Sequence, residues 1–203
     1  ALPYYEKYFA SSSAPSKIEY SEMGQLYYRL GEYQKAVDKS QQVTSENDTI
    51  AQNAYYHMAD CYLKLNEKEK ARNVFYACSQ YSVFPEIKED ALFSYAKLTY
   101  ELSFAPFNEA IKAMQNFMEL YPKSKYKDQA NSLMVKIFMS SKNYGEALKS
   151  LESITELSSD LRMAYQQIAY YRGLELFNNL DYNTAIVMFN KSMEYGVYDR
   201  VIN

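Results

Sequence analysis

Gly31-Glu32-Tyr33-Gln34-Lys35-Ala36-Val37 contains a pattern that recurs four more times along the chain: a turn-forming residue, then a short polar stretch, then an alanine followed in most copies by an apolar residue. The alanines of the five copies are Ala36, Ala71, Ala110, Ala147 and Ala185. They lie 35, 39, 37 and 38 residues apart. A nearly constant period of this length is typical of a solenoid built from repeated supersecondary units.

Each repeat is expected to consist of two amphipathic helices. In the first repeat Tyr20, Met23 and Tyr27 follow one another at intervals of three and four residues, which places them on one helical face. Gly31 is expected to end this helix, because glycine readily adopts the left-handed conformation of a helix cap. A small residue twelve positions before the anchor alanine marks a close helix crossing, and Gly24, Ala59 and Gly173 meet that spacing. No segment has the strict alternation of a half-buried strand, so the predicted fold class is all-α.

Proline and Ser/Asp clusters divide the chain into about five units within residues 16–197. The expected units are 17–50, 51–85, 86–124, 125–159 and 160–197. Residues 1–15 are expected to form the tail of a preceding helix and a linker, and residues 198–203 the start of a following helix. Because neither end has a polar capping repeat, the sequence is expected to be a segment of a larger solenoid.

These patterns resemble the tetratricopeptide repeat family, whose helix pairs stack into a right-handed superhelix. The second unit carries the resemblance well, with Tyr55, Ala59, Tyr62, Ala71 and Phe75 at the family's positions. Residues 117–126, Phe-Met-Glu-Leu-Tyr-Pro-Lys-Ser-Lys-Tyr, look like the variant found in bacterial envelope proteins of this family, such as outer-membrane assembly lipoproteins and the Tol-associated periplasmic protein. Ser40 departs from the pattern, since a bulky aromatic residue is usual there.

The resemblance implies that the first helix of each pair lines a concave groove that binds a peptide or a partner segment. Aromatic side chains suit such a surface, because they bury a large area at a small entropic penalty. The groove candidates are Tyr28, Arg29, Tyr56, Asp60, Lys64, Phe93, Lys97, Tyr100, Lys136, Tyr170 and Phe177. The aromatic members would act as anchors and the basic members as polar selectors. Many of these rings could instead pack between neighbouring helices.

Composition argues against several other classes of function. The 22 Lys and Arg residues face 25 Asp and Glu residues, so the chain lacks the basic excess that phosphate neutralisation in a nucleic-acid binder requires. No apolar run approaches the roughly 18 residues of a membrane span. The single histidine, His57, has no second histidine or cysteine pair with which to bind a metal. Cys61 and Cys78 are expected to be buried free thiols. With no phosphate-binding loop and no catalytic constellation, we expect neither a cofactor nor an enzyme.

The sequence therefore predicts a protein-interaction scaffold whose partner is an unidentified protein or peptide. Two alternatives remain open at this stage: a glycan- or small-solute-binding domain, since aromatic platforms flanked by amides also suit sugars, and an architectural spacer within a longer solenoid. The resemblance at residues 117–126 favours a location in the bacterial cell envelope. Exposed apolar end faces could also allow end-to-end self-association.

Overall fold

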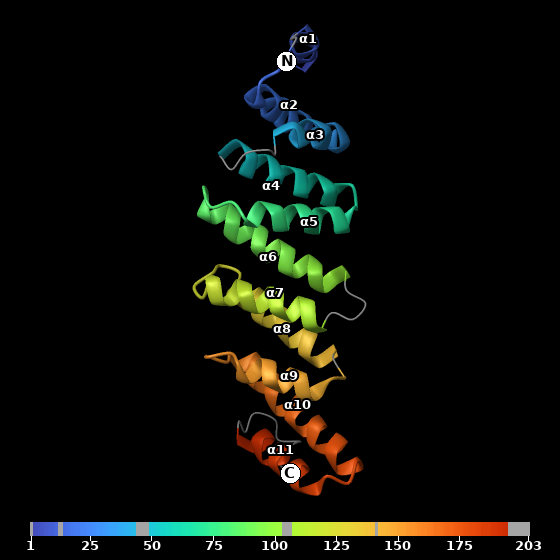
Figure 1. The fold of residues 1–203 in the computed structure, drawn as a ribbon, viewed down its shortest axis with the longest axis vertical. Coiled ribbons are helices and arrows are strands. Elements are labelled where there is room, and N and C mark those ends of the chain that lie inside the picture. Colours follow the sequence, from blue (N-terminus) through green and yellow to red (C-terminus); the bar gives the residue numbers. More distant parts are fainter. Residues whose placement is uncertain (1, 12–13, 44–48, 103–106, 141, 195–203) are drawn as a thin grey trace. The chain divides into compact units, whose positions relative to one another are not determined.

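The computed structural model describes residues 2–11, 14–43, 49–102, 107–140 and 142–194. Throughout these ranges the regular secondary structure is helical and contains no strand, which confirms the all-α prediction (Figure 1). The chain divides into two compact units, Ala1–Leu102 and Ser103–Asn203. The predicted start of a helix at 198–203 lies outside the described residues.

Unit 1 is built around a single apolar core. Its elements are α1 (Leu2–Ser11), α2 (Lys17–Arg29), α3 (Tyr33–Ser40), the short 3-10 helix η1 (Gln41–Val43), α4 (Thr49–Lys64), α5 (Lys68–Ser79) and α6 (Pro85–Leu102). Consecutive helices pack against each other from α1 to α6. Met23, Val37, Met58, Phe75 and Leu98 belong to one buried cluster, so each of the helices α2 to α6 contributes to the same core.

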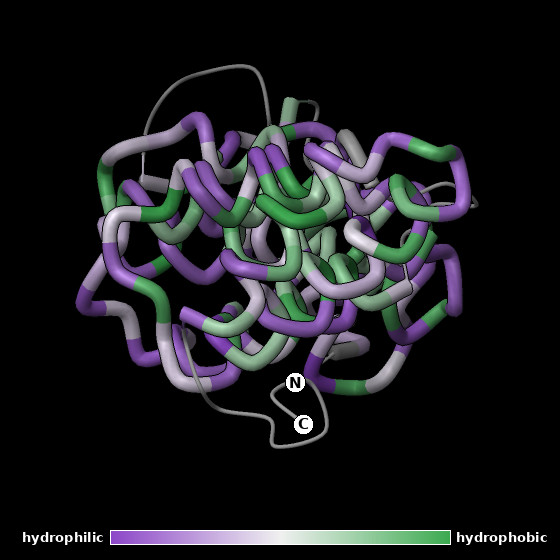
Figure 2. The backbone as a smooth tube through the Cα atoms, turned by 90° about the horizontal axis from the view of Figure 1, so that it is seen from below, coloured by the Kyte–Doolittle hydropathy of each residue, from purple (hydrophilic) through white to green (hydrophobic). Residues whose placement is uncertain are grey.

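Unit 2 repeats this arrangement with its own buried residues. Its helices are α7 (Phe107–Leu120), α8 (Lys127–Ser140), α9 (Tyr144–Glu152), α10 (Ser159–Asn178) and α11 (Tyr182–Glu194). Phe117, Met134, Phe138, Leu151 and Ile168 are almost completely buried. Green and purple residues alternate along the helical tubes of Figure 2, as expected of helices that bury one face only.

Three first helices end in the same way, at the same place in the repeat. Gly31, Asn66 and Leu180 each lie five residues before an anchor alanine, and their φ angles are 79°, 59° and 64°. In each case the next residue donates its backbone N–H to a carbonyl in the last turn: Glu32 to Tyr27, Glu67 to Tyr62 and Asp181 to Leu176. This is the bond pattern of a Schellman cap, which satisfies carbonyls at a helix end. The predicted end of the first helix at Gly31 is confirmed.

Close helix crossings explain two of the small residues. A Cβ atom added at Gly24 would lie 2.8 Å from the Oγ of Ser40, and one added at Gly173 would lie 2.5 Å from the ring of Phe189. Ser40 and Phe189 each lie four residues after an anchor alanine. Ser40, where the family usually has a bulky aromatic residue, therefore packs against Gly24 in the first repeat. At the equivalent position of the fifth repeat, Phe189 packs against Gly173.

The helix starts also follow from local chemistry. The side chain of Ser16 accepts a hydrogen bond from the N–H of Glu19, and the Glu19 carboxylate accepts one from the N–H of Ser16, which is a capping box. Ser158 caps α10 by accepting from the N–H of Leu161. Pro85 is the first residue of α6, a position where its missing N–H is not needed.

Candidate functional site

The groove candidates of unit 1 differ in how far they are exposed. Tyr28, Tyr56, Asp60 and Tyr100 are half-buried, whereas the basic residues reach solvent. The exposed basic residues are Arg29, Lys64 and Lys97. Phe93 is only 5% exposed, so its ring belongs to the packing between helices.

Two of the half-buried tyrosines join successive first helices. The Tyr28 hydroxyl on α2 donates a hydrogen bond of 2.5 Å to an Asp60 carboxylate oxygen on α4. The Tyr56 hydroxyl on α4 donates in the same way to Asp90 on α6. These bonds span 32 and 34 residues, close to one repeat. Together they form a tyrosine–aspartate ladder, defined here as Tyr28–Asp60 and Tyr56–Asp90.

The ladder raises the pKa of both tyrosines. The hydrogen bond to Asp60 is the main reason that the pKa of Tyr28 rises to about 12, with burial adding to it. For Tyr56, burial is the main cause of the raised pKa, and the hydrogen bond to Asp90 is the second. Both phenols are thus held in the protonated form that donates to the aspartate.

Aromatic neighbours fix the ladder rings in place. The centroid of the Tyr28 ring lies 6.0 Å from that of Tyr33 and 5.3 Å from that of His57. The Tyr56 ring packs edge-on against Phe75 at 6.0 Å and against His57 at 6.2 Å. Both aromatic pairs made by Tyr56 fall in the preferred range of centroid distances for such contacts.

His57, Cys61 and Cys78 carry no sign of metal or redox chemistry. Burial lowers the pKa of His57, and the positive charge of Arg29 lowers it further against the opposing effect of Asp60. The two cysteines are free and buried, as predicted, and burial raises their pKa values to about 11 for Cys61 and about 12 for Cys78. Raised thiol pKa values oppose formation of the reactive thiolate. Across the described ranges no group of three or more His, Cys, Asp or Glu side chains is placed to hold a metal ion.

The three candidates in unit 2 lie on α8 and α10. Lys136 is exposed on α8. Tyr170 is half-buried and its ring lies 5.8 Å from that of Phe189 on α11. Phe177 is 51% exposed and contacts Tyr182 at 5.3 Å between centroids. Each of the two aromatic residues therefore combines packing with an accessible surface.

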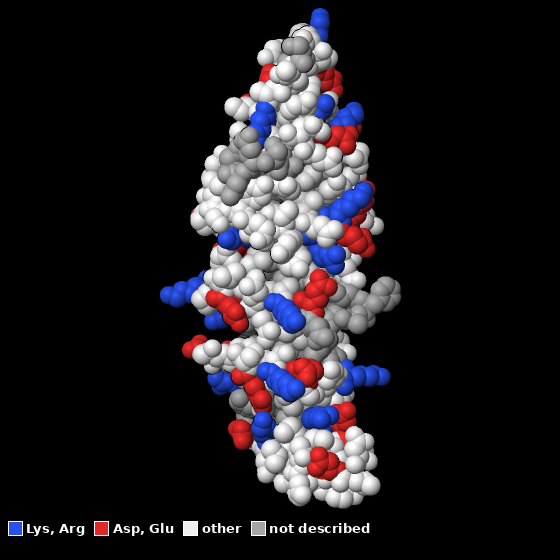
Figure 3. Space-filling view, in the orientation of Figure 1, with Lys and Arg blue, Asp and Glu red and all other residues white. Residues whose placement is uncertain are grey.

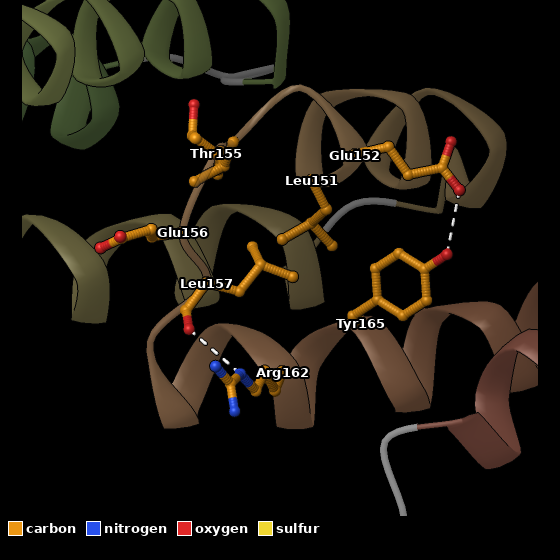
Figure 4. Close-up of a pocket in the computed structure, with 8 residues that line it drawn as sticks. Leu151, Glu152, Thr155, Glu156, Leu157, Arg162 and Tyr165 are labelled. Atoms are coloured by element: carbon orange, nitrogen blue, oxygen red, sulfur yellow. Dashed lines mark hydrogen bonds between the residues drawn. The ribbon is translucent and has the colours of Figure 1, made fainter.

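Unit 2 also contains a cavity of about 530 Å³ that sequence reasoning missed. It lies between the end of α9 and the start of α10 (Figure 4). Tyr165 donates from its hydroxyl to Glu152 at 2.9 Å, and Arg162 donates from Nε to the carbonyl of Leu157 at 3.1 Å. A hydrogen bond from Lys191, followed by the weaker one from Tyr165, lowers the pKa of Glu152.

A second cavity of about 510 Å³ is lined in part by the same connection. Its lining combines apolar side chains of the α7 end and the following turn (Met118, Tyr121, Pro122) with Ile154, Thr155 and Glu156, and the last three residues line both cavities. The segment Ile154–Glu156, together with the two cavities, is called the α9–α10 notch below.

α9 ends early beside the notch. It stops at Glu152, five residues after Ala147, whereas α5, α11 and α7 continue for eight, nine and ten residues past their anchor alanines. α3 also stops early, at Ser40, but the 3-10 helix η1 continues from it to Val43. The Gln115 amide on α7 donates to the carbonyl of Ser150 at 3.2 Å and to the hydroxyl of Ser153 at 3.1 Å. Ser153 also returns a hydrogen bond to the Ser150 carbonyl. These contacts satisfy the end of the helix, since serine favours such local bonds over a further turn.

Charge is intermixed on the surface. Blue and red side chains alternate on the face shown in Figure 3. Within the described residues, no helix combines the length and the apolarity that crossing a bilayer would require.

Comparison with known proteins addresses the fold. The family model described as ANAPC3, anaphase-promoting complex, cyclosome, subunit 3, matches residues 1–78. No curated protein sequence matches the chain.

Solved structures align over most of the chain at low identity. A MamA RS-1 double mutant has 15% identity and a TM-score of 0.50, covering 91% of this chain and 97% of its own. MamA from Desulfovibrio magneticus RS-1 has 16% identity and a TM-score of 0.49, and the alignment covers 91% of this chain and 97% of that one. YrrB, described as a TPR protein with an unusual peptide-binding site, has 15% identity and a TM-score of 0.48. The alignment covers 92% of this chain and 89% of YrrB. The helix pairs, together with the similarity to the MamA double mutant, show the fold to be a helical solenoid of repeats.

Proposed function

We propose that this protein is a non-catalytic interaction scaffold that binds a peptide or partner segment along the first helices of its repeats. The observation that carries the proposal is the set of half-buried rings Tyr28, Tyr56 and Tyr100 on α2, α4 and α6, the same helices that carry the exposed cations Arg29, Lys64 and Lys97. Rings with one face packed and the other accessible are the usual anchors of protein interfaces, and a few of them contribute most of the affinity.

Preorganisation supports this role for the tyrosine–aspartate ladder. The hydroxyls of Tyr28 and Tyr56 already have aspartate partners, so a ligand would contact the rings and not the hydroxyl groups. Rings that are fixed before binding lose little rotamer freedom when a partner arrives. The proposed recognition is therefore by stacking and apolar contact, with specificity supplied by the charges nearby.

The exposed cations predict the charge of the partner. Arg29, Lys64 and Lys97 form no ion pair with a described residue. Lys136 on α8 is likewise exposed. Exposed charges of this kind select partners and speed association more than they add affinity. We expect a partner segment that combines aromatic or apolar residues with Asp or Glu.

Selection from a displayed library of random peptides would test the proposal. The wild-type chain should enrich peptides that contain acidic and apolar residues. Replacing Arg29, Lys64 and Lys97 with Glu should weaken binding of those peptides by about tenfold or more, because each replacement turns attraction into repulsion. Because Arg29 and Lys64 lie in the last turns of α2 and α4, reversing their charge should lower the urea midpoint slightly, and binding is compared under conditions where circular dichroism shows both proteins to be folded.

The matched control replaces Lys7, Lys112 and Lys142 with Glu. These exposed lysines lie on α1, on α7 and before α9, and the replacement changes the net charge by the same amount. Peptides lost from the first variant but kept by the control support the groove. Equal loss from both, or no enrichment at all, would contradict it and favour the spacer function.

A further inference from the structure

We propose that the α9–α10 notch of unit 2 is a second docking site, which binds a short peptide segment carrying an apolar side chain next to a basic one. The proposal does not depend on the groove of the first helices. It starts from two cavities of about 530 and 510 Å³ that share the non-helical segment following α9. Volumes of this size lie within the range of sites for small ligands and side-chain clusters.

The segment between the two helices offers free backbone groups. The N–H of Ile154 donates to the carbonyl of Leu151, but Thr155 and Glu156 make no backbone or side-chain hydrogen bond with any described residue. In Figure 4 the side chains of Thr155 and Glu156 point away from Tyr165. Peptide backbones bind most readily where donors and acceptors of the receptor are still unpaired.

The second cavity provides the apolar part of the site. Met118 is partly buried, and the Tyr121 ring is held against Phe117 with 5.6 Å between centroids. Pro122 and Ile154 complete this wall. An apolar side chain of a partner would remove these carbon surfaces from water, which gives about 25 cal/mol per Å² of buried area.

Charge at the rim indicates a basic neighbour for that apolar side chain. Glu119 and Glu156 line the second cavity, are exposed, and have no ion pair with the described part of the chain. One exposed amine, that of Lys127, shares the lining with these two carboxylates. The rim therefore has one more negative than positive charge, which favours Lys or Arg on the partner over Asp or Glu.

Three defined peptides would test the proposal by nuclear magnetic resonance on the full isotope-labelled chain. The probe alternates Val with Lys over eight residues, so that apolar and basic side chains are adjacent. The second peptide replaces Lys with Glu, and the third replaces Val with Pro to remove half of the backbone donors. The Val-Lys peptide should shift the amide signals of Ile154, Thr155 and Glu156 and the methyl signal of Met118. Both other peptides should bind about tenfold more weakly or not at all.

A charge-reversed variant places the binding. Glu119→Lys combined with Glu156→Lys should lower the affinity for the Val-Lys peptide about tenfold. The control Glu69→Lys combined with Glu194→Lys makes the same change of charge at exposed residues that lack a described partner, and it should bind as the wild type does. Unchanged affinity in the first variant would overturn the proposal.

Other outcomes are equally decisive. Shifts confined to α2, α4 and α6 would place the peptide in the groove of unit 1, which overturns the notch and also contradicts the expected preference of that groove for acidic segments. Equal binding of the Pro-Lys peptide would mean attraction by charge alone and would overturn a built peptide site. No shift with any peptide would also overturn it, and the groove would remain to be judged by its own variants.

Discussion

Leu180 holds a backbone conformation that suits glycine better than leucine. Its φ of 64° lies in the left-handed region, where an L-residue loses about 1 kcal/mol to the contact between Cβ and the carbonyl. The same place in the repeat is taken by Gly31 in the first unit. Since 72% of the Leu180 side chain is exposed, replacing it sacrifices little packing.

We predict that Leu180→Gly raises the free energy of unfolding by about 1 kcal/mol, and that Gly31→Ala lowers it by a similar amount. Urea denaturation followed by far-UV circular dichroism would measure both. Asn179→Gly is the control, because Asn179 has a φ of −85° and gains nothing from glycine. If the control were stabilised as much as Leu180→Gly, relief of backbone strain would not be the cause.

The hydroxyl of Tyr28 in the ladder makes the free energy of unfolding depend on pH in the alkaline range. Its pKa is raised from 10.0 to about 12 in the folded chain, so the folded state keeps the phenol proton to higher pH than the unfolded state does. The resulting stabilisation is complete below pH 10 and disappears as the pH rises through about 12.

We therefore predict that Tyr28→Phe is less stable than the wild type by about 1 kcal/mol at neutral pH, and that the difference shrinks between pH 10 and pH 12. The measurement is a urea midpoint at each pH for both proteins. Tyr76→Phe serves as control, because Tyr76 is half exposed and its hydroxyl has no described partner. A constant difference across the pH range would show that the Tyr28–Asp60 bond does not stabilise the fold.

At the scale of elements, a buried glutamine fixes the entry into α6. Gln52 on α4 is fully buried, donates to the carbonyl of Phe84 at 3.1 Å and accepts from the N–H of Phe84 at 2.7 Å. Phe84 directly precedes Pro85, the first residue of α6. The side-chain amide of Gln52 therefore forms a pair of hydrogen bonds with the backbone of the turn between two repeats. The Cys78 thiol on α5 also donates to the backbone carbonyl of Gln52, and the Ser192 hydroxyl on α11 donates in the same way to the backbone carbonyl of Gln166 on α10.

We predict that Gln52→Leu, which keeps the side-chain volume, lowers the free energy of unfolding by about 2 kcal/mol, because the N–H of Phe84 loses its partner and its carbonyl keeps only the hydrogen bond from Lys88. Hydrogen exchange at the Phe84 amide should become faster. Gln34→Leu is the matched control, since Gln34 is exposed on α3 and bonds only to Asp38. Unchanged exchange at Phe84 would mean that the amide pair contributes nothing to the turn.

The sequence predicted the helices better than it predicted the contacts between them. Periodicity and the anchor alanines are local signals, so the helix pairs and the cap at Gly31 could be predicted. The cap at Leu180 could not be predicted from residue type, because leucine rarely has positive φ, although its place in the repeat was a signal. The Tyr28–Asp60 bond joins residues 32 apart and depends on how helices stack, which composition does not reveal. The notch was missed because it is lined by residues of α7 and of the segment after α9, and contacts between such separate elements, like the bond from Gln115 to the Ser150 carbonyl, cannot be read from residue type.

At the scale of the whole molecule, stacking makes each second helix a surface for the next first helix. The residue after the anchor alanine is apolar and buried in three repeats: Val37 is 0% exposed, Ile111 3% and Leu148 5%. In a solenoid each repeat is stabilised by such contacts with its neighbours. Ile186 has the same place in α11 but is 57% exposed, and Tyr182, Val187 and Met193 of the same helix are each about half exposed.

We predict that this face of α11 drives end-to-end self-association, because exposed apolar patches of this kind are characteristic of interaction surfaces. Sedimentation velocity should find an average mass that rises with concentration. Ile186→Glu should move that rise to about tenfold higher concentration, since a carboxylate would have to be buried in the contact. Thr184→Glu adds the same charge at an exposed polar residue on the opposite side of the same helix and should have a much smaller effect. A mass that stays constant at all concentrations, or an equal response of both variants, would rule out α11 as the contact.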